Sequence, residues 1–160
     1  EIRSRGLGDV YKRQVLYTDK FVGKTQINLN LANNKKISFD LESSDMTELL
    51  KNSDFVSLHV PAQKSYVIGK NEFNLMKTGA GLINAARGGV VDEKSLIESL
   101  DSGKLAFAGV DTFENEPKPS VKLLMHPKVS LTPHIGAATN EAQDRIGIEL
   151  ANQIMTLVKE

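Results

Sequence analysis

Cysteine and tryptophan are absent from the 160 residues, and aromatic residues make up only 6% of them. Without cysteine the chain can form neither a disulfide nor a thiolate metal site, which excludes disulfide-bonded miniature folds and cysteine-zinc modules. This composition fits a reducing cytoplasm, which is the location that we expect. A chain of this length can bury roughly 70% of its unfolded surface without cross-links. The sequence therefore predicts an ordinary globular domain.

An excess of charge is also absent, because 20 basic side chains balance 20 acidic ones. Nucleic-acid surfaces depend on clustered positive charge, and this balance gives no reason to expect one. No stretch approaches the roughly 18 consecutive apolar residues of a membrane-spanning helix. We therefore expect neither nucleic acid nor a membrane as a partner.

Residues 1–14 differ in composition and hydrophobic pattern from the rest of the chain. Basic side chains outnumber acidic ones there, and neither helical nor strand periodicity is visible. From Val15 onward, short apolar runs alternate with helical patterns. We expect a boundary near residue 14, with a foreign or disordered segment before it.

The remainder has the pattern of strands that alternate with helices. The expected strands are residues 15–17, 36–39, 55–60, 80–85, 105–110 and 128–132, with a polar loop over 28–35. Asp45, Asn71 and Asp92 are expected to cap three helices, and a long helix with apolar residues at i+4 spacing begins at Thr139 or Asn140. This order predicts an α/β fold, a Rossmann-like parallel sheet with flanking helices. Because the strands are continuously apolar, we expect both faces of the sheet to be covered.

Polar side chains follow three of these strands at once. Arg87 comes after residues 80–85, the segment 111–117 with its carboxylates comes after 105–110, and His134 comes after 128–132. In an open parallel sheet, ligands bind outside the carboxyl ends of the strands. An arginine can hold a substrate carboxylate, and a histidine beside a carboxylate can move a proton near neutral pH. The three segments together predict a catalytic edge.

Each of these features alone has an ordinary structural explanation. An arginine before two glycines, a loop carboxylate and a histidine after proline are all common in surface turns. The joint placement is what favours chemistry. Of the other histidines, we expect His59 to be a core residue inside its strand and His126 to lie at the surface without a nearby carboxylate.

Metal and serine-hydrolase chemistry are not indicated. The three histidines have no metal-ligand spacing, and no GxSxG motif occurs. Asp19, just after the first strand, stands where dinucleotide-binding folds bond ribose hydroxyls. The glycine fingerprint expected before it is missing, because Tyr11 occupies the third glycine position after Gly6 and Gly8.

Four segments in order resemble the NAD-dependent D-2-hydroxyacid dehydrogenase family. They are DFVSLHVP (54–61), GLINAARGGVVDEKSL (81–96), FAGVDTFENEP (107–117) and LTPHIGAATNEAQDRIG (131–147). The resemblance is greatest to the branch that oxidises 3-phosphoglycerate for serine biosynthesis. It implies an oxidoreductase that transfers hydride between NAD and a small 2-hydroxy or 2-keto acid, as a homodimer in the full-length protein. Residues 15–160 would be a partial NAD-binding domain, and 139–160 the helix that returns toward a substrate domain.

The resemblance also implies roles for individual residues. Arg87 would bind the substrate carboxylate, His134 would be the acid/base, and Glu116 would be its paired carboxylate. Asp19 would bind the adenosine ribose and favour NAD over NADP. The full set of residues expected at the cofactor is Asp19, Val60, Pro61, Ala85, Ala86, Arg87, Asp111, His134, Gly136 and Ala137.

Departures from the family pattern limit this interpretation. The first β-α unit, with its pyrophosphate-binding glycines, is not recognisable in residues 1–14. We therefore expect this chain alone to bind NAD weakly or not at all and to be inactive. Two alternatives to the 3-phosphoglycerate branch stay open: a glyoxylate/hydroxypyruvate or D-lactate type of reductase, and a non-enzymatic NAD-sensing module like the corepressors that resemble this family.

Overall fold

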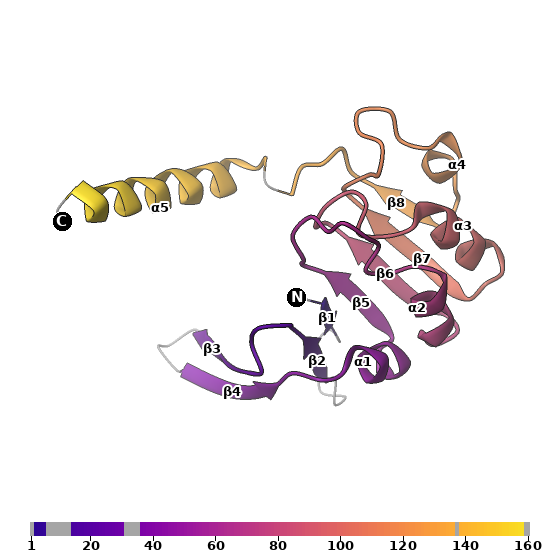
Figure 1. The fold of residues 1–160 in the computed structure, drawn as a ribbon, viewed down its shortest axis with the longest axis horizontal. Helices are drawn as coiled ribbons and strands as arrows, with labels where there is room; N and C mark the ends of the chain where they lie inside the picture. The colour runs from indigo at the N-terminus through magenta and orange to yellow at the C-terminus, as the bar shows by residue number, and fades with distance from the viewer. Residues whose placement is uncertain (1, 6–13, 31–35, 137, 159–160) are drawn as a thin grey trace.

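A six-stranded sheet forms the centre of the protein, as the computed structural model in Figure 1 shows. The structure describes residues 2–5, 14–30, 36–136 and 138–158. The strands are β1 (Ile2–Arg5), β2 (Val15–Thr18), β3 (Lys24–Asn30), β4 (Lys36–Glu42), β5 (Phe55–Leu58), β6 (Ala80–Asn84), β7 (Leu105–Val110) and β8 (Val129–Leu131). The order in the sheet is β2-β1-β5-β6-β7-β8, while β3 and β4 form a separate two-stranded sheet.

Strands β5 to β8 are parallel, which confirms the predicted fold class. Each strand pairs with the next one in the chain, so every connection crosses over the sheet and returns to the same edge. The carboxyl ends of the four strands therefore lie together. This alignment brings the segments after residues 84, 110 and 131 to one edge.

Strand β1 lies between β2 and β5 and runs antiparallel to both. Nothing in the sequence of residues 1–14 indicated a strand there. Because β1 is reversed, its carboxyl end at Arg5 lies beside Val15, at the opposite edge from the ends of β2 and β5. The origin of residues 1–14 stays a prediction.

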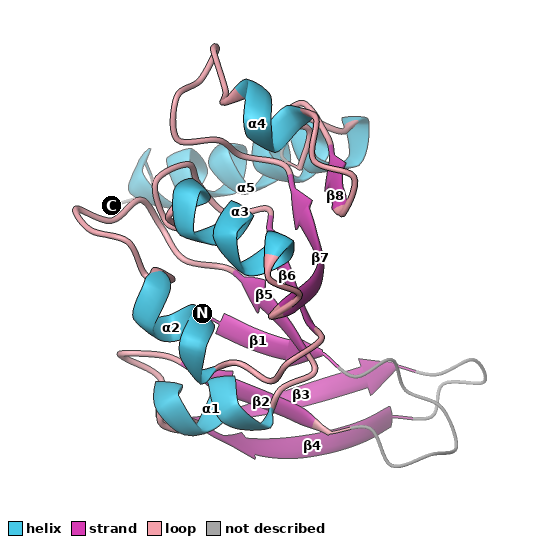
Figure 2. Cartoon of the chain, turned by 90° about the vertical axis from the view of Figure 1, so that its right-hand side faces the viewer, coloured by secondary structure: helices cyan, strands magenta, loops and turns pink. Residues whose placement is uncertain are grey.

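The helices that flank the sheet lie in one layer (Figure 2). They are α1 (Met46–Asn52), α2 (Lys70–Leu75), α3 (Glu93–Asp101) and α4 (Val121–Leu124). On the other face of the sheet, Phe55, Ile83 and Phe107 are each 39–40% exposed. The prediction that both faces of the sheet are covered is therefore wrong for the described residues. A continuously apolar strand places apolar side chains on both faces of the sheet. The pattern does not identify what covers each face.

Local capping explains where these helices begin. The Asp45 carboxylate accepts the N–H of Thr47 at 2.8 Å, and the Asp92 carboxylate accepts from the first turn of α3, as predicted. The predicted cap Asn71 is wrong, because α2 begins two residues earlier, with Gly69 at its N-cap. There the Gly69 N–H donates to the Glu72 side chain at 2.9 Å. Glycine lacks a capping side chain, so the signal lay in the glutamate three positions later.

The β3–β4 hairpin corrects the predicted loop over 28–35, because residues 28–30 belong to β3. Residues 31–35 lie outside the described residues. Side chains alternate along the hairpin: Ile27 pairs with Phe39 and Leu29 with Ile37, while Gln26 bonds to Asp40 on the polar face. This period of two is typical of a ribbon with one apolar face.

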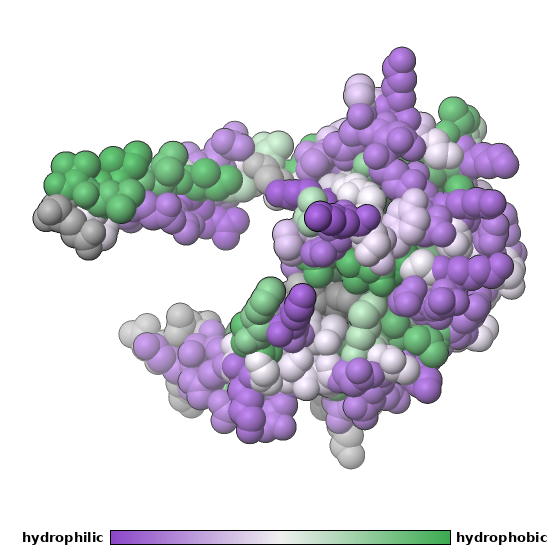
Figure 3. Space-filling model, in the orientation of Figure 1, coloured by the Kyte–Doolittle hydropathy of each residue, from purple (hydrophilic) through white to green (hydrophobic). Residues whose placement is uncertain are grey.

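Helix α5 (Asn140–Val158) extends away from the sheet (Figure 1). Its start agrees with the predicted one. Its apolar side chains form a stripe that Figure 3 shows in green, and the exposed members are Ile146, Ile148, Leu150, Ile154, Met155, Leu157 and Val158. Among the helices of the described residues, none combines the length and the apolar character that a membrane span needs.

The core lies between the sheet and the layer of four helices, and Leu82 in β6 is completely buried in it. Ile83, the next residue, is on the open face. We expect Leu82→Ala to lower the free energy of unfolding by about 2–5 kcal/mol, because a buried cavity forms. Ile83→Ala is the matched control and is expected to lose about 1 kcal/mol or less. Urea denaturation measures both, and equal losses would contradict the assignment of the core face.

Candidate active site

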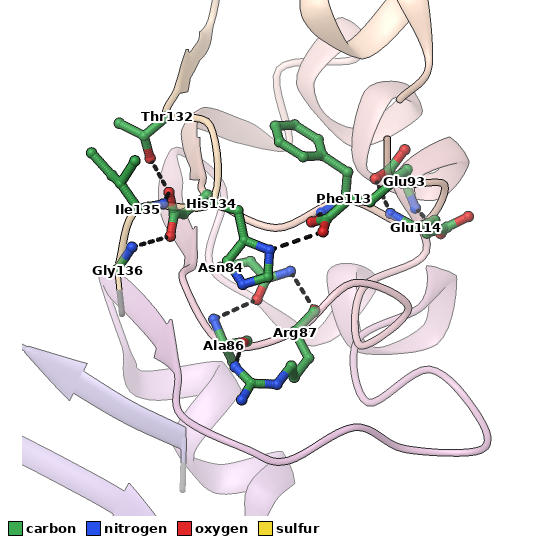
Figure 4. Close-up of polar contacts among 12 residues, drawn as sticks. Asn84, Ala86, Arg87, Glu93, Phe113, Glu114, Thr132, His134, Ile135 and Gly136 are labelled. Carbon is green, nitrogen blue, oxygen red and sulfur yellow. Dashed lines mark hydrogen bonds and ion pairs between the residues drawn. The ribbon is translucent and has the colours of Figure 1, made fainter. Parts of the chain in front are cut away.

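Three loops meet at the carboxyl edge of the parallel strands (Figure 4). The loop after β6 carries Arg87, the loop after β7 carries Glu116, and the loop after β8 carries His134. These are the three predicted catalytic residues, and they come from segments far apart in the sequence. The sheet topology thus brings all three loops to the predicted edge.

Glu116 and His134 form a hydrogen-bonded pair, with 2.9 Å between Oε2 and Nδ1. A carboxylate only accepts hydrogen bonds, so Nδ1 of His134 carries the proton and donates it. This tautomer leaves Nε2 with its lone pair, free to accept a proton from a ligand. The side chains are 37% and 40% exposed, so a ligand can reach the pair.

The second carboxylate oxygen of Glu116 accepts the backbone N–H of Phe113 at 2.9 Å. This bond first, and the hydrogen bond with His134 next, hold the pKa of Glu116 below its ordinary value. Glu116 is therefore ionised at neutral pH and aimed at the histidine from a fixed backbone donor.

The backbone of His134 has φ = 55°, in the left-handed region that residues other than glycine rarely adopt. Asp111 holds this turn together. Its Oδ1 accepts the N–H of Ile135 and its Oδ2 that of Gly136, both at 2.9 Å, and the Thr132 hydroxyl also donates to it. The strained conformation persists because these bonds stabilise it.

Asp111 is 6% exposed, which makes it a buried carboxylate. Burial alone would raise its pKa, but the hydrogen bonds from Thr132, Ile135 and Gly136 together hold the pKa below the ordinary value. We predicted Asp111 as a cofactor contact. In the structure its oxygens bind the turn of His134, which is a positioning role that the sequence did not indicate.

Asn84 organises the arginine loop in a similar way. Its side-chain oxygen accepts the N–H of Ala86, and its amide donates to the carbonyl of Arg87, both at 3.2 Å. The Arg87 guanidinium donates to the Ala86 carbonyl at 2.7 Å and is exposed at the edge of the sheet. Sequence reasoning missed Asn84, although a polar residue that ends an apolar strand was an available signal.

Gly88 connects the arginine loop with the glutamate loop. A Cβ atom built on Gly88 would lie 1.9 Å from the carbonyl oxygen of Phe113, so only glycine allows this approach. The backbones of the two loops are therefore in direct contact. Movement of one must displace the other.

The remaining predicted cofactor contacts lie at the same edge or outside the described residues. Asp19 follows β2, and its Oδ1 accepts the N–H groups of Phe21 and Val22, which lower its pKa. Val60 and Pro61 follow β5, and Ala85 and Ala86 follow β6. Gly136 lies against Asp111, and Ala137 is outside the described residues.

Both expectations for the other histidines are wrong. His59 is exposed because β5 ends at Leu58, and its Nε2 lies 2.9 Å from the Ser57 hydroxyl. His126 is 9% exposed, and its Nε2 lies 3.2 Å from Asp101 while Nδ1 accepts the N–H of Lys128. The carboxylate comes from α3, 25 residues away in the chain, which local sequence could not reveal.

The edge of the sheet offers chemically suitable groups for parts of a dinucleotide. Asp19 presents a carboxylate that can accept hydrogen bonds from ribose hydroxyls, and the edge carries small residues at Ala85, Ala86 and Gly136. Strand β1, which lies between β2 and β5, ends at the opposite edge, so among the described residues no helix follows it here to receive a pyrophosphate. In the same residues, no group of three or more histidines and carboxylates could hold a metal ion.

Comparisons with known proteins agree with this geometry. The sequence model described as "D-isomer specific 2-hydroxyacid dehydrogenase, NAD binding domain" matches residues 9–136. That match begins before Val15, where the motifs had placed the start of the similarity. Hydroxypyruvate reductase of Thermotoga maritima is 47% identical over 119 residues, which are 71% of this chain and 39% of that protein. D-3-phosphoglycerate dehydrogenase of Methanocaldococcus jannaschii is 44% identical over 117 residues, covering 72% of this chain and 22% of that protein.

Solved structures that resemble this chain are also 2-hydroxyacid dehydrogenases or related reductases. A glyoxylate reductase from Paecilomyes thermophila has a TM-score of 0.69 and 36% identity, over 75% of this chain and 37% of that one. D-lactate dehydrogenase from Aquifex aeolicus, complexed with NAD and lactic acid, has a TM-score of 0.61 and 35% identity, over 74% of this chain and 41% of that one. The chain therefore spans well under half the length of these relatives.

Removal of the Asp111 carboxylate is expected to weaken the turn of His134. We expect Asp111→Ala to lower the free energy of unfolding by about 1–3 kcal/mol at neutral pH, because the N–H groups of Ile135 and Gly136 lose their acceptor. Because the folded-state pKa is depressed, this stabilisation is complete above the ordinary carboxyl pKa and is lost as pH falls through the folded value. The difference between wild type and variant should therefore shrink in acid.

Chemical denaturation at neutral and acidic pH measures this difference. Asp144→Asn, at an exposed position of α5, is the control and is expected to change stability little. A loss in Asp111→Ala that stays constant down to strongly acidic pH would contradict the role of the ionised carboxylate.

Proposed function

The chain belongs to the D-isomer-specific 2-hydroxyacid dehydrogenase family through its NAD-binding domain, and we propose that it is the part of an oxidoreductase that moves the proton during hydride transfer between NAD and a 2-hydroxy or 2-keto acid. The single observation that carries the proposal is the hydrogen bond between Glu116 and His134 at the carboxyl edge of the sheet, beside the loop of Arg87. The rest of the proposal follows from the chemistry of these side chains.

His134 acts as the acid/base. With Nδ1–H donated to Glu116, Nε2 can take the hydroxyl proton of a 2-hydroxy acid as its C2–H bond breaks. The negative charge of Glu116 stabilises the imidazolium that forms. In the reverse direction, the imidazolium returns the proton to the oxygen of a 2-keto acid. The pair thereby serves both oxidation and reduction.

Arg87 holds the substrate. Its guanidinium is permanently charged and planar, which suits a carboxylate with two parallel hydrogen bonds. The carboxylate and the 2-oxygen of the substrate are adjacent, so an arginine beside His134 can orient both. Asn84 supports this role because its side chain hydrogen-bonds to the backbone of the arginine loop at Ala86 and Arg87.

We assign the full set of predicted contacts to the cofactor: Asp19, Val60, Pro61, Ala85, Ala86, Arg87, Asp111, His134, Gly136 and Ala137. Bound NAD would supply the acceptor for the hydride. The carboxylate of Asp19 would repel a 2′-phosphate, which favours NAD over NADP.

For the natural substrate we propose 3-phosphoglycerate, with a role in serine biosynthesis. Support comes from the motifs in residues 81–96 and 107–117, and from the 44% identity to a D-3-phosphoglycerate dehydrogenase. A glyoxylate or hydroxypyruvate reductase is the second candidate, because the relative from Thermotoga maritima is 47% identical. We further propose a cytoplasmic enzyme that works as a homodimer when complete.

The isolated 160-residue chain is expected to bind NAD with a dissociation constant weaker than micromolar. The reason is the reversed strand β1, which directs its carboxyl end away from the edge where a pyrophosphate would bind. Isothermal titration calorimetry of NAD into the purified chain measures this affinity. Micromolar binding would show that the chain holds the pyrophosphate by other groups.

Catalysis is expected to depend on Arg87 and His134 in a longer protein that contains this domain. We expect Arg87→Ala and His134→Ala each to lower kcat/KM by roughly a hundredfold or more, because substrate orientation or proton transfer is lost. Absorbance of NADH with a panel of 2-keto acids, including hydroxypyruvate and glyoxylate, measures turnover. Arg145→Ala, at an exposed position of α5, is the matched control.

The outcomes separate the candidate functions. Binding of NAD by the longer protein without turnover of any 2-hydroxy or 2-keto acid would overturn the enzymatic proposal and favour an NAD-sensing module. Equal turnover in wild type and His134→Ala would overturn the assigned acid/base.

A further inference from the structure

Glu93 and Glu114 make a reciprocal pair of hydrogen bonds at the back of the site (Figure 4). The backbone N–H of Glu93 donates to the carboxylate of Glu114, and the backbone N–H of Glu114 donates to the carboxylate of Glu93, both at 2.8 Å. Glu93 is the first residue of α3, and Glu114 lies in the loop after β7. We call this pair the glutamate clamp, because it joins two elements through four groups.

The clamp is electrostatically unfavourable. The Glu93 residue is only 7% exposed, and burial, together with the charge of Glu114, raises its pKa. A carboxyl group with a raised folded-state pKa destabilises the fold above that pKa and ceases to do so as pH falls. Burial of the Glu93 carboxyl near the charge of Glu114 therefore destabilises the fold at a pH above that raised pKa. Local conflicts of this kind are expected where geometry serves function.

The loop that the clamp holds is the one that aims Glu116. Phe113 directly precedes Glu114, and its N–H is the donor that fixes Oε1 of Glu116 at 2.9 Å. The other oxygen of Glu116 binds Nδ1 of His134. A displacement of the peptide between Phe113 and Glu114 would therefore move the carboxylate away from the histidine.

Two further interactions involve Phe113 and Glu114. The carbonyl of Phe113 lies against Gly88, next to Arg87, so the clamp also supports the arginine loop. The Tyr66 side chain, from the segment between β5 and α2, lies close enough to Glu114 for that charge to raise the pKa of the Tyr66 hydroxyl. Segments that follow three different strands thus meet at the position that the clamp holds.

We propose that Glu93 and Glu114 are positioning residues of the reaction, which fix the peptide between Phe113 and Glu114 and so hold Glu116 against His134. Neither carboxylate touches the substrate. The catalytic meaning of the clamp rests on the proposed function. The geometry itself can be tested without turnover, in the chain alone.

The titration of the Glu116 carboxyl distinguishes positioning from simple electrostatics, because the two predict opposite shifts. If Glu114 acted only through its charge, its removal would lower the pKa of Glu116, since a like charge would be lost. If Glu114 positions the loop, its removal weakens the hydrogen bonds that Glu116 accepts, and the pKa of Glu116 rises.

The experiment follows the side-chain carboxyl ¹³C shift of Glu116 against pH in the 160-residue chain. We expect Glu114→Ala to raise the Glu116 midpoint by roughly half a unit to one unit. Glu114→Gln should keep it close to that of wild type, because the amide oxygen still accepts the Glu93 N–H. Glu98→Ala, at an exposed position of the same helix α3, is the matched control and should leave the midpoint unchanged.

Glu114→Asp covers the case in which the alanine variant does not fold. It keeps the charge but is too short to reach the Glu93 N–H, so it should also raise the midpoint. An unchanged or lowered Glu116 midpoint in the folded alanine variant, or in the aspartate variant when alanine does not fold, would overturn the proposal. This titration involves neither NAD nor substrate. Its result is therefore independent of whether the proposed enzymatic function is correct.

Discussion

Parallel strands leave backbone N–H groups free where their loops begin, and the site depends on how these groups are satisfied. At this edge the acceptors are side chains: Asn84 binds the arginine loop, Asp111 the histidine turn, and Glu116 the N–H of Phe113. A buried N–H without a partner would cost about 1–3 kcal/mol. The same bonds that satisfy the loops therefore determine where the guanidinium, the carboxylate and the imidazole lie.

This arrangement explains why charged groups gather at one edge without unfolding it. Asp111 and Glu116 accept bonds from N–H groups or from a histidine, so each remains ionised in the fold. Glu93 is the exception, because burial acts against its charge. Asp111 and Glu116 thus stabilise their loops as carboxylates, whereas the charge of Glu93 is opposed by its burial.

Sequence reasoning predicted the parallel strands β5 to β8, the caps Asp45 and Asp92, and a carboxylate of residues 111–116 beside His134, while the choice of Glu116 came from the family resemblance. These features follow from short-range patterns and from the rule that ligands bind at strand ends. The exposure of His59 and the contact of His126 with Asp101 were not accessible, because both depend on where a strand stops or on a distant helix. Sequence reasoning missed Glu93 and Glu114 for the same reason, since each bonds to a residue 21 positions away. Asn84 is different, because its partners Ala86 and Arg87 are local in the sequence.

The left-handed backbone of His134 has an evolutionary consequence. Glycine or asparagine would suit φ = 55° better, and the penalty for other L-residues there is about 1 kcal/mol. Substitution by glycine or asparagine at this position would therefore tend to gain stability while it abolishes proton transfer. A histidine can persist at such a backbone position only under continued selection for its imidazole, so relatives that abandon catalysis should lose it early.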